Sequence, residues 1–200
     1  MNLKSVFDFI KKQIRFKFIF NAIFFVFIMV LLAFPSAKAL FIRGLMMVGM
    51  FQPEIPSDTV RLAVSPAFSF IDKSGKTVTL ADLSGKVVFI NFWATWCPPC
   101  LAELPSVNDL YKHFQNDPRV VFLIVDTDND FKTSLPFIAR HQYNLPVYIS
   151  GSANPPQLIG SSIPTTVVIN KRGQMVFRHE GTANYSGKNF EAYLTRLSEE

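Results

Sequence analysis

The sequence has few of the residues that build metal sites and disulfide frameworks. Its 200 residues include only two cysteines, Cys97 and Cys100, and three histidines that are scattered singly. Structural zinc sites need four ligands, usually with a second Cys or His pair at matched spacing. Both cysteines also lie far from the N-terminal apolar segment, which excludes a lipid-modified cysteine there. We therefore expect no metal and no other cofactor.

The basic charge of the chain is confined to its N-terminal quarter. Residues 1–51 carry seven Lys or Arg and one acid, whereas residues 52–200 carry 13 basic and 14 acidic side chains. The isoelectric point of about 9.3 therefore describes the N-terminal segment alone. Because the remainder lacks a basic excess, nothing in the composition favours a nucleic-acid partner.

One long apolar run, residues 18–34, contains a single polar residue, Asn21. Its 17 residues reach the lower end of the length of a membrane-spanning helix, and five Lys or Arg precede it. The positive-inside rule then places the N-terminus in the cytoplasm and the rest of the chain outside. A cleaved signal peptide is the alternative, since Ala37-Lys38-Ala39 resembles a cleavage site. Cleavage would expose the apolar segment 40–51 at the new N-terminus, so we favour a retained anchor.

These features predict three parts of the chain. Residues 1–51 would form a cytoplasmic basic segment, a transmembrane anchor and an apolar juxtamembrane segment that lies at the interface or beside the span. Residues 52–63 contain two prolines and would form a linker, and residues 64–200 a folded domain. We expect a single-pass protein of the cell (inner) membrane, with this domain on the extracytoplasmic or periplasmic side.

Two cysteines separated by two residues form the most informative motif. They follow an apolar, β-branched run at residues 87–94, which predicts a buried central strand. A Cys-x-x-Cys pair can close a disulfide, release it and close it again, as thiol–disulfide exchange requires. A structural disulfide is the weaker interpretation, because so small a ring constrains little of the chain.

After Cys97 the sequence predicts a helix that continues to about Phe114. Cys97 would be the N-cap and Pro98 the first helical residue, a position that proline favours. Since Pro98 and Pro99 have no N–H, the first donor facing the Cys97 sulfur is that of Cys100. This donor and the helix dipole favour a thiolate and lower the pKa of Cys97 below about 8.5. We expect Cys97 to attack and the less exposed Cys100 to resolve.

A resemblance to the active site of the thioredoxin superfamily rests on Phe92-Trp93-Ala94-Thr95-Trp96-Cys97-Pro98-Pro99-Cys100. The next residues, Leu101-Ala102-Glu103-Leu104-Pro105, are similar to the TlpA/ResA/CcmG-like group of membrane-anchored thiol–disulfide oxidoreductases. The resemblance covers residues 64–200. It implies an α/β, thioredoxin-like three-layer fold, with a mixed central sheet flanked by helices and an N-terminal β-hairpin.

The remaining pattern predicts elements that agree with this fold. Alternating residues indicate hairpins at 68–80 and 165–179. Between and after them we expect a strand at 120–125, a helix at 129–143, a strand at 147–149, a helical turn capped by Asn154 and a closing helix at 186–197. A βαβ crossover followed by an antiparallel hairpin gives a mixed sheet with helices on both faces.

Pro164 precedes a predicted strand. An ordinary trans bond is the default, since only about 5–6% of X–Pro bonds in folded proteins are cis. In thioredoxin-like proteins, however, the proline at this place is cis and faces the disulfide. The resemblance therefore implies a cis Ile163–Pro164 bond, with Ile163 beside Cys97, where its backbone can pair with a substrate segment. Trp96 and Pro98 are expected to complete the substrate-binding surface.

Glu103 lies three residues after Cys100 and shares its helical face. A surface acid near a helix N-terminus is the default interpretation. In the ResA-like group, however, a glutamate in this place handles the proton of the resolving cysteine. Asn91 stands where thioredoxins carry a buried aspartate with a similar task, and an amide cannot transfer a proton. We therefore favour a catalytic role for Glu103.

The resemblance implies an enzyme that reduces protein disulfides outside the cytoplasm through a Cys97–Cys100 dithiol/disulfide cycle. Its partners would be protein disulfides, including those of apocytochrome c in cytochrome c maturation, and a DsbD- or CcdA-like membrane electron donor. A disulfide-forming oxidant stays open, because direction depends on thiolate stabilisation. A copper- or haem-handling chaperone is disfavoured, since Sco-like carriers use Cys-x-x-x-Cys. Ala94, where peroxiredoxins have threonine, disfavours a peroxidase.

Overall fold

A computed structural model of the chain describes residues 3–55, 62–152 and 156–200. The chain divides into two compact units, Met1–Lys38 and Ala39–Glu200. In the first unit, helix α1 (Leu3–Ala33) contains a 19-residue stretch, Arg15–Ala33, with mean hydropathy 2.5. Its length and composition suit a membrane span. This stretch overlaps the apolar run predicted as the anchor, residues 18–34, whose orientation stays a prediction.

Helix α2 (Pro35–Met47) begins in the first unit and ends in the second. Within the second unit, Ala39 and Met46 pack against Ala102 of helix α3 (Pro98–Phe114). Leu40 and Met47 remain largely exposed. One side of the predicted juxtamembrane segment thus belongs to the surface of the α/β unit, and the other side presents apolar residues to the surroundings.

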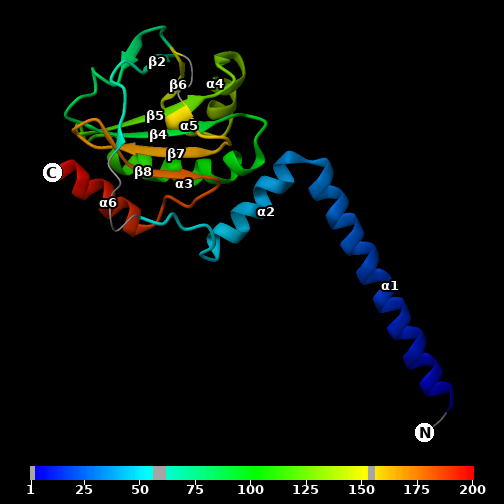
Figure 1. Cartoon of the computed structure of the whole chain (residues 1–200). Coiled ribbons are helices and arrows are strands. Elements are labelled where there is room, and N and C mark those ends of the chain that lie inside the picture. Colours follow the sequence, from blue (N-terminus) through cyan, green and yellow to red (C-terminus); the bar gives the residue numbers. More distant parts are fainter. Residues whose placement is uncertain (1–2, 56–61, 153–155) are drawn as a thin grey trace. The chain divides into compact units, whose positions relative to one another are not determined.

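The second unit is built around one mixed sheet (Figure 1). In the described ranges its strands lie in the order β1-β8-β7-β4-β5-β6-β2-β3. They are β1 (Leu62–Ala63), β2 (Ser69–Asp72), β3 (Thr77–Thr79), β4 (Val87–Trp93), β5 (Val120–Asp126), β6 (Val147–Ser150), β7 (Thr165–Ile169) and β8 (Gln174–Glu180). β5 runs parallel to both β4 and β6, and the other pairs are antiparallel.

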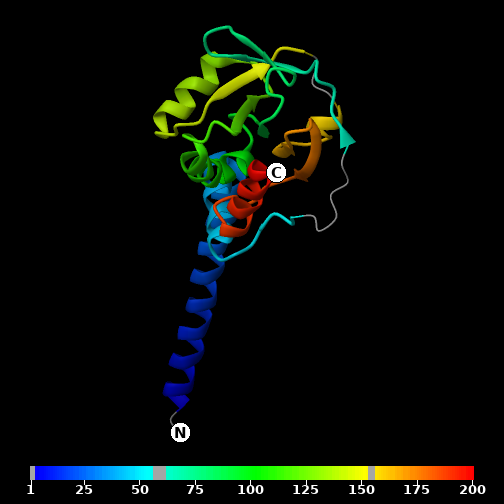
Figure 2. The ribbon, with the colours of Figure 1, turned by 90° about the vertical axis from the view of Figure 1, so that its left-hand side faces the viewer.

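Both faces of β4 are covered, which explains why Asn91 is its only polar residue. On one face, Phe89 and Trp93 belong to a core shared with α3, α4 (Phe131–Arg140) and α6 (Lys188–Glu199). On the other, Ile90 and Phe92 pack with the β2–β3 region and with Leu158 of α5 (Pro156–Ile159). Helices on both faces are therefore confirmed, although α5 is the only one on the second face among the described residues. In Figures 1 and 2, α3 and α6 lie side by side.

The predicted hairpins are both confirmed, and the helix ends differ from prediction for local reasons. The predicted helix 129–143 starts at Phe131, because Asp130 caps it with an Oδ1 that accepts from Lys132 N at 3.0 Å. The closing helix starts at Lys188, after the N-cap residue Gly187. Residues 62 and 63, predicted as the end of the linker, form β1 and pair with β8. The predicted Asn154 cap lies outside the described residues.

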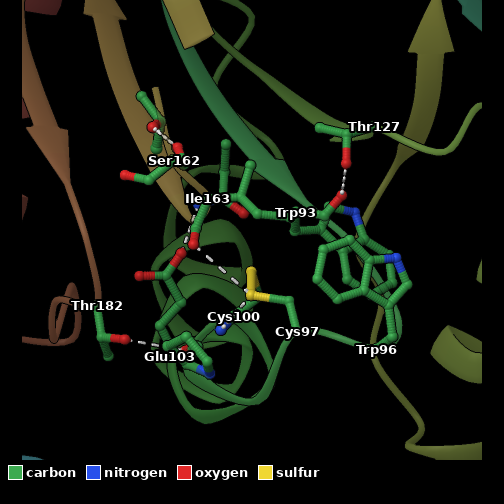
Figure 3. The surroundings of a disulfide bond; sticks show 12 residues. Trp93, Trp96, Cys97, Cys100, Glu103, Thr127, Ser162, Ile163 and Thr182 are labelled. Carbon is green, nitrogen blue, oxygen red and sulfur yellow. Dashed lines mark hydrogen bonds between the residues drawn. A yellow bond between two sulfur atoms is a disulfide. The ribbon is translucent and has the colours of Figure 1, made fainter. Parts of the chain in front are cut away.

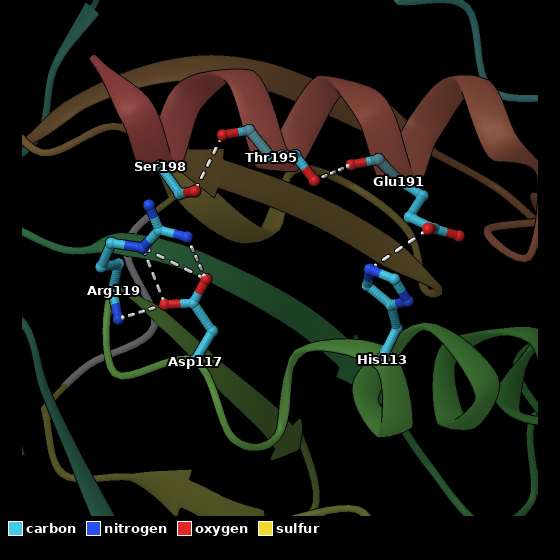
Figure 4. A network of polar contacts seen from close by, with 6 residues as sticks. All are labelled: His113, Asp117, Arg119, Glu191, Thr195 and Ser198. Carbon is cyan, nitrogen blue, oxygen red and sulfur yellow. Dashed lines mark hydrogen bonds and ion pairs between the residues drawn. The ribbon is translucent and has the colours of Figure 1, made fainter.

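Polar contacts on the surface join the ends of α3 and α6 away from the cysteines (Figure 4). His113 Nε2 of α3 lies 3.1 Å from Glu191 Oε1 of α6. In the turn between α3 and β5, the Arg119 guanidinium pairs with Asp117 at 2.7 Å and holds the pKa of that carboxyl at about 2. Solvent reaches these side chains and screens their charges, so each pair is expected to contribute little to stability.

Candidate active site

Cys97 lies between the end of β4 and the start of α3. The strand ends at Trp93, and Cys97 is the N-cap residue of α3 with extended backbone angles, φ −88° and ψ 103°. The N–H of Cys100 donates to Cys97 Sγ at 3.3 Å, whereas Pro98 and Pro99 supply no donor. The predicted cap is thereby confirmed, since the side chain of Cys97 takes the place of an oxygen acceptor.

Cys97 and Cys100 form a disulfide (Figure 3). Their Cα atoms are 5.3 Å apart. Cys97 retains 3% of its accessible surface and Cys100 none. Cys100 is thus the less exposed of the two, as expected, and the division between an attacking and a resolving cysteine stays a prediction.

Trp96 is an exposed side chain beside Cys97. It is 62% exposed, and its Nε1 donates to Asp128 Oδ2 at 2.8 Å. Trp93 is fully buried and lies against Phe137 of α4, with ring centroids 5.6 Å apart. Trp93 is thus a packing residue, as predicted, and Trp96 offers an apolar surface next to the disulfide. Nothing in the sequence indicated that Asp128 orients Trp96.

The loop before β7 lies across the disulfide from Trp96. The Ile163–Pro164 peptide bond is cis, as predicted. Ile163 O lies 3.8 Å from Cys97 Sγ (Figure 3). Neighbouring hydrogen bonds fix this loop: Thr165 Oγ1 donates to Ser162 O at 2.6 Å, and Gly181 N donates to Pro164 O at 2.8 Å. Ile163 is partly exposed, so a partly exposed residue of this loop lies beside the reactive sulfur.

Glu103 is fully buried on the first turns of α3, which rules out the surface-acid interpretation. Its Oε1 accepts from Asn91 Nδ2 at 2.7 Å, and its Oε2 accepts from Ala183 N at 3.1 Å. Burial raises the pKa of Glu103 to about 8, against the lowering effect of these two hydrogen bonds. Glu103 follows Cys100 by three residues on α3, so the two side chains share one face of the helix (Figure 3). A carboxyl group with this pKa can take up or release a proton near neutral pH.

Two residues of the site, Thr166 and Thr182, were not predicted from the sequence. Asn91 Nδ2 also donates to Thr166 Oγ1 of β7, at 2.9 Å. Thr182 Oγ1 donates to Pro99 O at 3.2 Å, which ties the loop after β8 to the start of α3. Among the described residues no three His, Cys, Asp or Glu side chains lie close enough to hold a metal ion. The polar groups that are brought together here suit proton and thiol chemistry.

Comparison with known proteins agrees with this geometry. Residues 62–194 match the Redoxin family. A thiol-disulfide oxidoreductase ResA of Bacillus cereus is 32% identical over 138 residues, which cover 67% of this chain and 76% of that protein. ResA of Bacillus subtilis (strain 168) is 35% identical over 123 residues, covering 61% of this chain and 68% of that protein.

Solved structures show the same fold. A thiol:disulfide interchange protein of the thioredoxin family from Chlorobium tepidum TLS superposes with a TM-score of 0.55 at 24% identity, over 70% of this chain and 99% of its own. The family match, the ResA relatives and the redox pair at the start of α3 lead to one conclusion. The chain belongs to the Redoxin family and is a thiol–disulfide oxidoreductase with a thioredoxin-like fold.

Proposed function

We propose that the protein is a membrane-anchored, extracytoplasmic reductase of protein disulfides. The choice of reduction over oxidation rests on how few hydrogen-bond donors face Cys97 Sγ. The N–H of Cys100 is the one hydrogen-bond donor to this sulfur within the described residues, because prolines occupy both intervening positions. A strongly oxidising pair requires a strongly stabilised thiolate in its reduced form. A single donor gives modest stabilisation and therefore favours a reductant.

The reductive cycle begins at Cys97. Its thiolate attacks one sulfur of the substrate disulfide, the substrate S–S bond breaks, and the departing thiolate takes a proton from solvent. Cys100 then transfers its proton to the Glu103 carboxylate and attacks Cys97 Sγ. The Cys97–Cys100 disulfide forms as the second substrate thiolate leaves. Two electrons have passed to the substrate. A dithiol donor must then reduce the Cys97–Cys100 disulfide before the next cycle.

The substrate is proposed to lie between Trp96 and the Ile163–Pro164 loop. Ile163 is partly exposed and its carbonyl oxygen lies beside Cys97, which supports strand-like pairing with an extended segment around the substrate cysteine. Trp96 and Pro98 would contact the flanking side chains. Apocytochrome c segments are our proposed substrates, and cytochrome c maturation the process.

The membrane placement rests on α1. Its apolar stretch follows a segment rich in Lys and Arg, which favours a cytoplasmic N-terminus and a catalytic unit on the other side. Outside the cytoplasm no thioredoxin pool is available, so we propose a DsbD- or CcdA-like membrane protein as the dithiol donor. A membrane-impermeant maleimide tests the location. It should label the reduced Cys97 in intact cells, and labelling only after lysis would contradict this placement.

The reduction potential of the Cys97–Cys100 pair tests the direction. The full-length protein in detergent would be equilibrated in glutathione or dithiothreitol redox buffers, and the thiol content quantified by alkylation. We expect a value near or below the roughly −270 mV of thioredoxin. A value near about −120 mV, as in DsbA, would make the protein an oxidant and contradict the proposal.

A further inference from the structure

The hydrogen bonds around Glu103 are suited to only one of its two protonation states. Both partners of the carboxyl group are donors, Asn91 Nδ2 on one oxygen and Ala183 N on the other. Two donors stabilise a carboxylate, which is an acceptor only. A protonated Glu103 carries an O–H that needs an acceptor, and a buried donor without one is costly. The proposed cycle, however, requires Glu103 to hold the proton of Cys100 for part of each turnover.

The acceptor that the neutral acid needs is already next to it. Asn91 is fully buried in β4, and its Oδ1 has no hydrogen-bond partner among the residues that the structure describes. A half-turn of the amide exchanges Oδ1 with Nδ2, so that the oxygen faces Glu103 Oε1 in place of the nitrogen. After the half-turn, Nδ2 occupies the place where Oδ1 had no hydrogen-bond partner. Each of the two arrangements therefore leaves one atom of the amide without a partner. Neither protonation state of Glu103 is favoured as strongly as a fixed donor would favour it.

Thr166 can follow this exchange because a hydroxyl group both donates and accepts. In the structure, its Oγ1 accepts from Asn91 Nδ2 at 2.9 Å. After the half-turn, the same hydroxyl donates to Asn91 Oδ1. Ala183 N, by contrast, is a backbone donor whose direction is fixed. The pair formed by Asn91 and Thr166 is therefore the adaptable part of the surroundings of Glu103.

We propose that Asn91 is a positioning residue whose amide turns as Glu103 gains and loses a proton, with Thr166 following by reversing its hydroxyl. This proposal rests on the proposed role of Glu103 as the proton acceptor for Cys100. The step is balanced: the proton leaves Cys100 Sγ, joins Glu103 Oε1, and then passes from Glu103 to the departing substrate thiolate. Asn91 itself neither gains nor loses a proton.

The other titratable groups beside Glu103 are Cys100 on α3 and Tyr185 on the loop before α6. Burial, followed by the Glu103 carboxylate, raises the pKa of Tyr185 well above its usual value, so the tyrosine stays neutral. No charged side chain in the described part of the chain contributes to the pKa of Glu103. A change in the pH profile of the attack of Cys100 on the mixed disulfide therefore reports on Glu103, Cys100 and the Asn91 amide.

The test is the release of a preformed mixed disulfide between Cys97 and a peptide, followed by stopped flow from pH 5 to 10 in the full-length protein. The variants are N91L and T166V, with T166S as the control that keeps a hydroxyl. N91L removes a donor that lowers the pKa of Glu103, so its profile should move to higher pH. Because the turned amide also stabilises the neutral acid, this shift should be smaller than the roughly one to two pH units that loss of a fixed donor to a charged group gives. A shift of that full size would mean that the amide does not turn. T166V should move the profile in the same direction by less, and T166S should match the wild type.

NMR of the wild-type protein tests the turning without a destabilising variant. The Asn91 side-chain amide protons should show a nuclear Overhauser effect to the Thr166 methyl group at high pH. This effect should weaken as Glu103 becomes protonated, and E103Q should abolish its pH dependence. An effect that persists unchanged across the titration would overturn the proposal.

The outcomes distinguish the role of Glu103 from the role of Asn91. If E103Q slows release while N91L and T166V keep the wild-type profile, the role of Asn91 is wrong and the role of Glu103 stands. If E103Q releases substrate at the wild-type rate, the role of Glu103 as proton acceptor is wrong, and the inference about Asn91 fails with it.

Discussion

The burial of Glu103 should make the stability of the protein fall as pH rises through neutrality. The pKa of this group is raised from 4.5 to about 8 in the folded chain, with burial as the largest cause. An unfolded chain therefore releases the proton at lower pH than the folded one. Because the unfolded state binds fewer protons between the two values, stability is full below the unfolded pKa and is lost progressively up to the folded pKa.

The magnitude follows from the size of the shift. Taking the unfolded value of 4.5 and the folded value of about 8, the free energy of unfolding should fall by about 2–3 kcal/mol between pH 5 and pH 7. The fall should continue to pH 8 and then level off. This sign is the opposite of that expected for a surface carboxylate in an ion pair, such as Asp117, whose pKa is lowered.

Urea unfolding of the oxidised full-length protein in detergent, followed by tryptophan fluorescence at pH 5, 6, 7 and 8, measures this dependence. The matched control is Glu103→Gln, which keeps the size of the side chain and removes the titration. Burial also raises the pKa of Asp126, which contributes with the same sign, so the difference between the two proteins isolates Glu103. A wild-type stability that stays constant or rises from pH 5 to 8 would refute the argument.

Three further predictions concern the redox pair, its rim and the core. Cys97→Ser should abolish disulfide reduction, whereas Cys100→Ser should accumulate mixed disulfides that non-reducing gels reveal; a Cys97→Ser protein that still turns over would contradict the mechanism. Asp128→Asn weakens the hydrogen bond that orients Trp96, so KM for a peptide disulfide should rise about two- to tenfold with kcat unchanged, as steady-state kinetics would show; an unchanged KM would mean that Trp96 needs no such support. Phe190→Ala removes a buried ring that packs on Phe177 and Tyr185, and should lower the free energy of unfolding by about 3–5 kcal/mol in urea titrations. A loss below about 1 kcal/mol would mean that the core repacks around the missing ring.

Local chemistry made the redox pair predictable. Cys97 caps α3 because the next two residues are prolines, which have no N–H, and Cys100 then donates its N–H to the Cys97 sulfur. This arrangement involves only four consecutive residues. The strand β4 was equally clear, since a strand buried on both faces is mostly apolar and Asn91 is its one polar residue. The helix ends at Phe131 and Lys188 were less certain, because a cap depends on the backbone angles of one residue. The cis bond before Pro164 required the resemblance to thioredoxin-like proteins, because the composition around a proline alone favours trans.

The sequence by itself determined the reactive cysteines, the strand that presents them and the apolar helix before the domain, because each is encoded by neighbours along the chain. Only the tertiary structure decided the surroundings of these residues. Glu103 is buried because residues 12 and 80 positions away, Asn91 and Ala183, close over it and bind its oxygens. Trp96 is oriented by Asp128, 32 positions away. Hydrogen bonds between side chains so distant in sequence leave no periodic pattern, so they emerge only when the sheet brings its strands together.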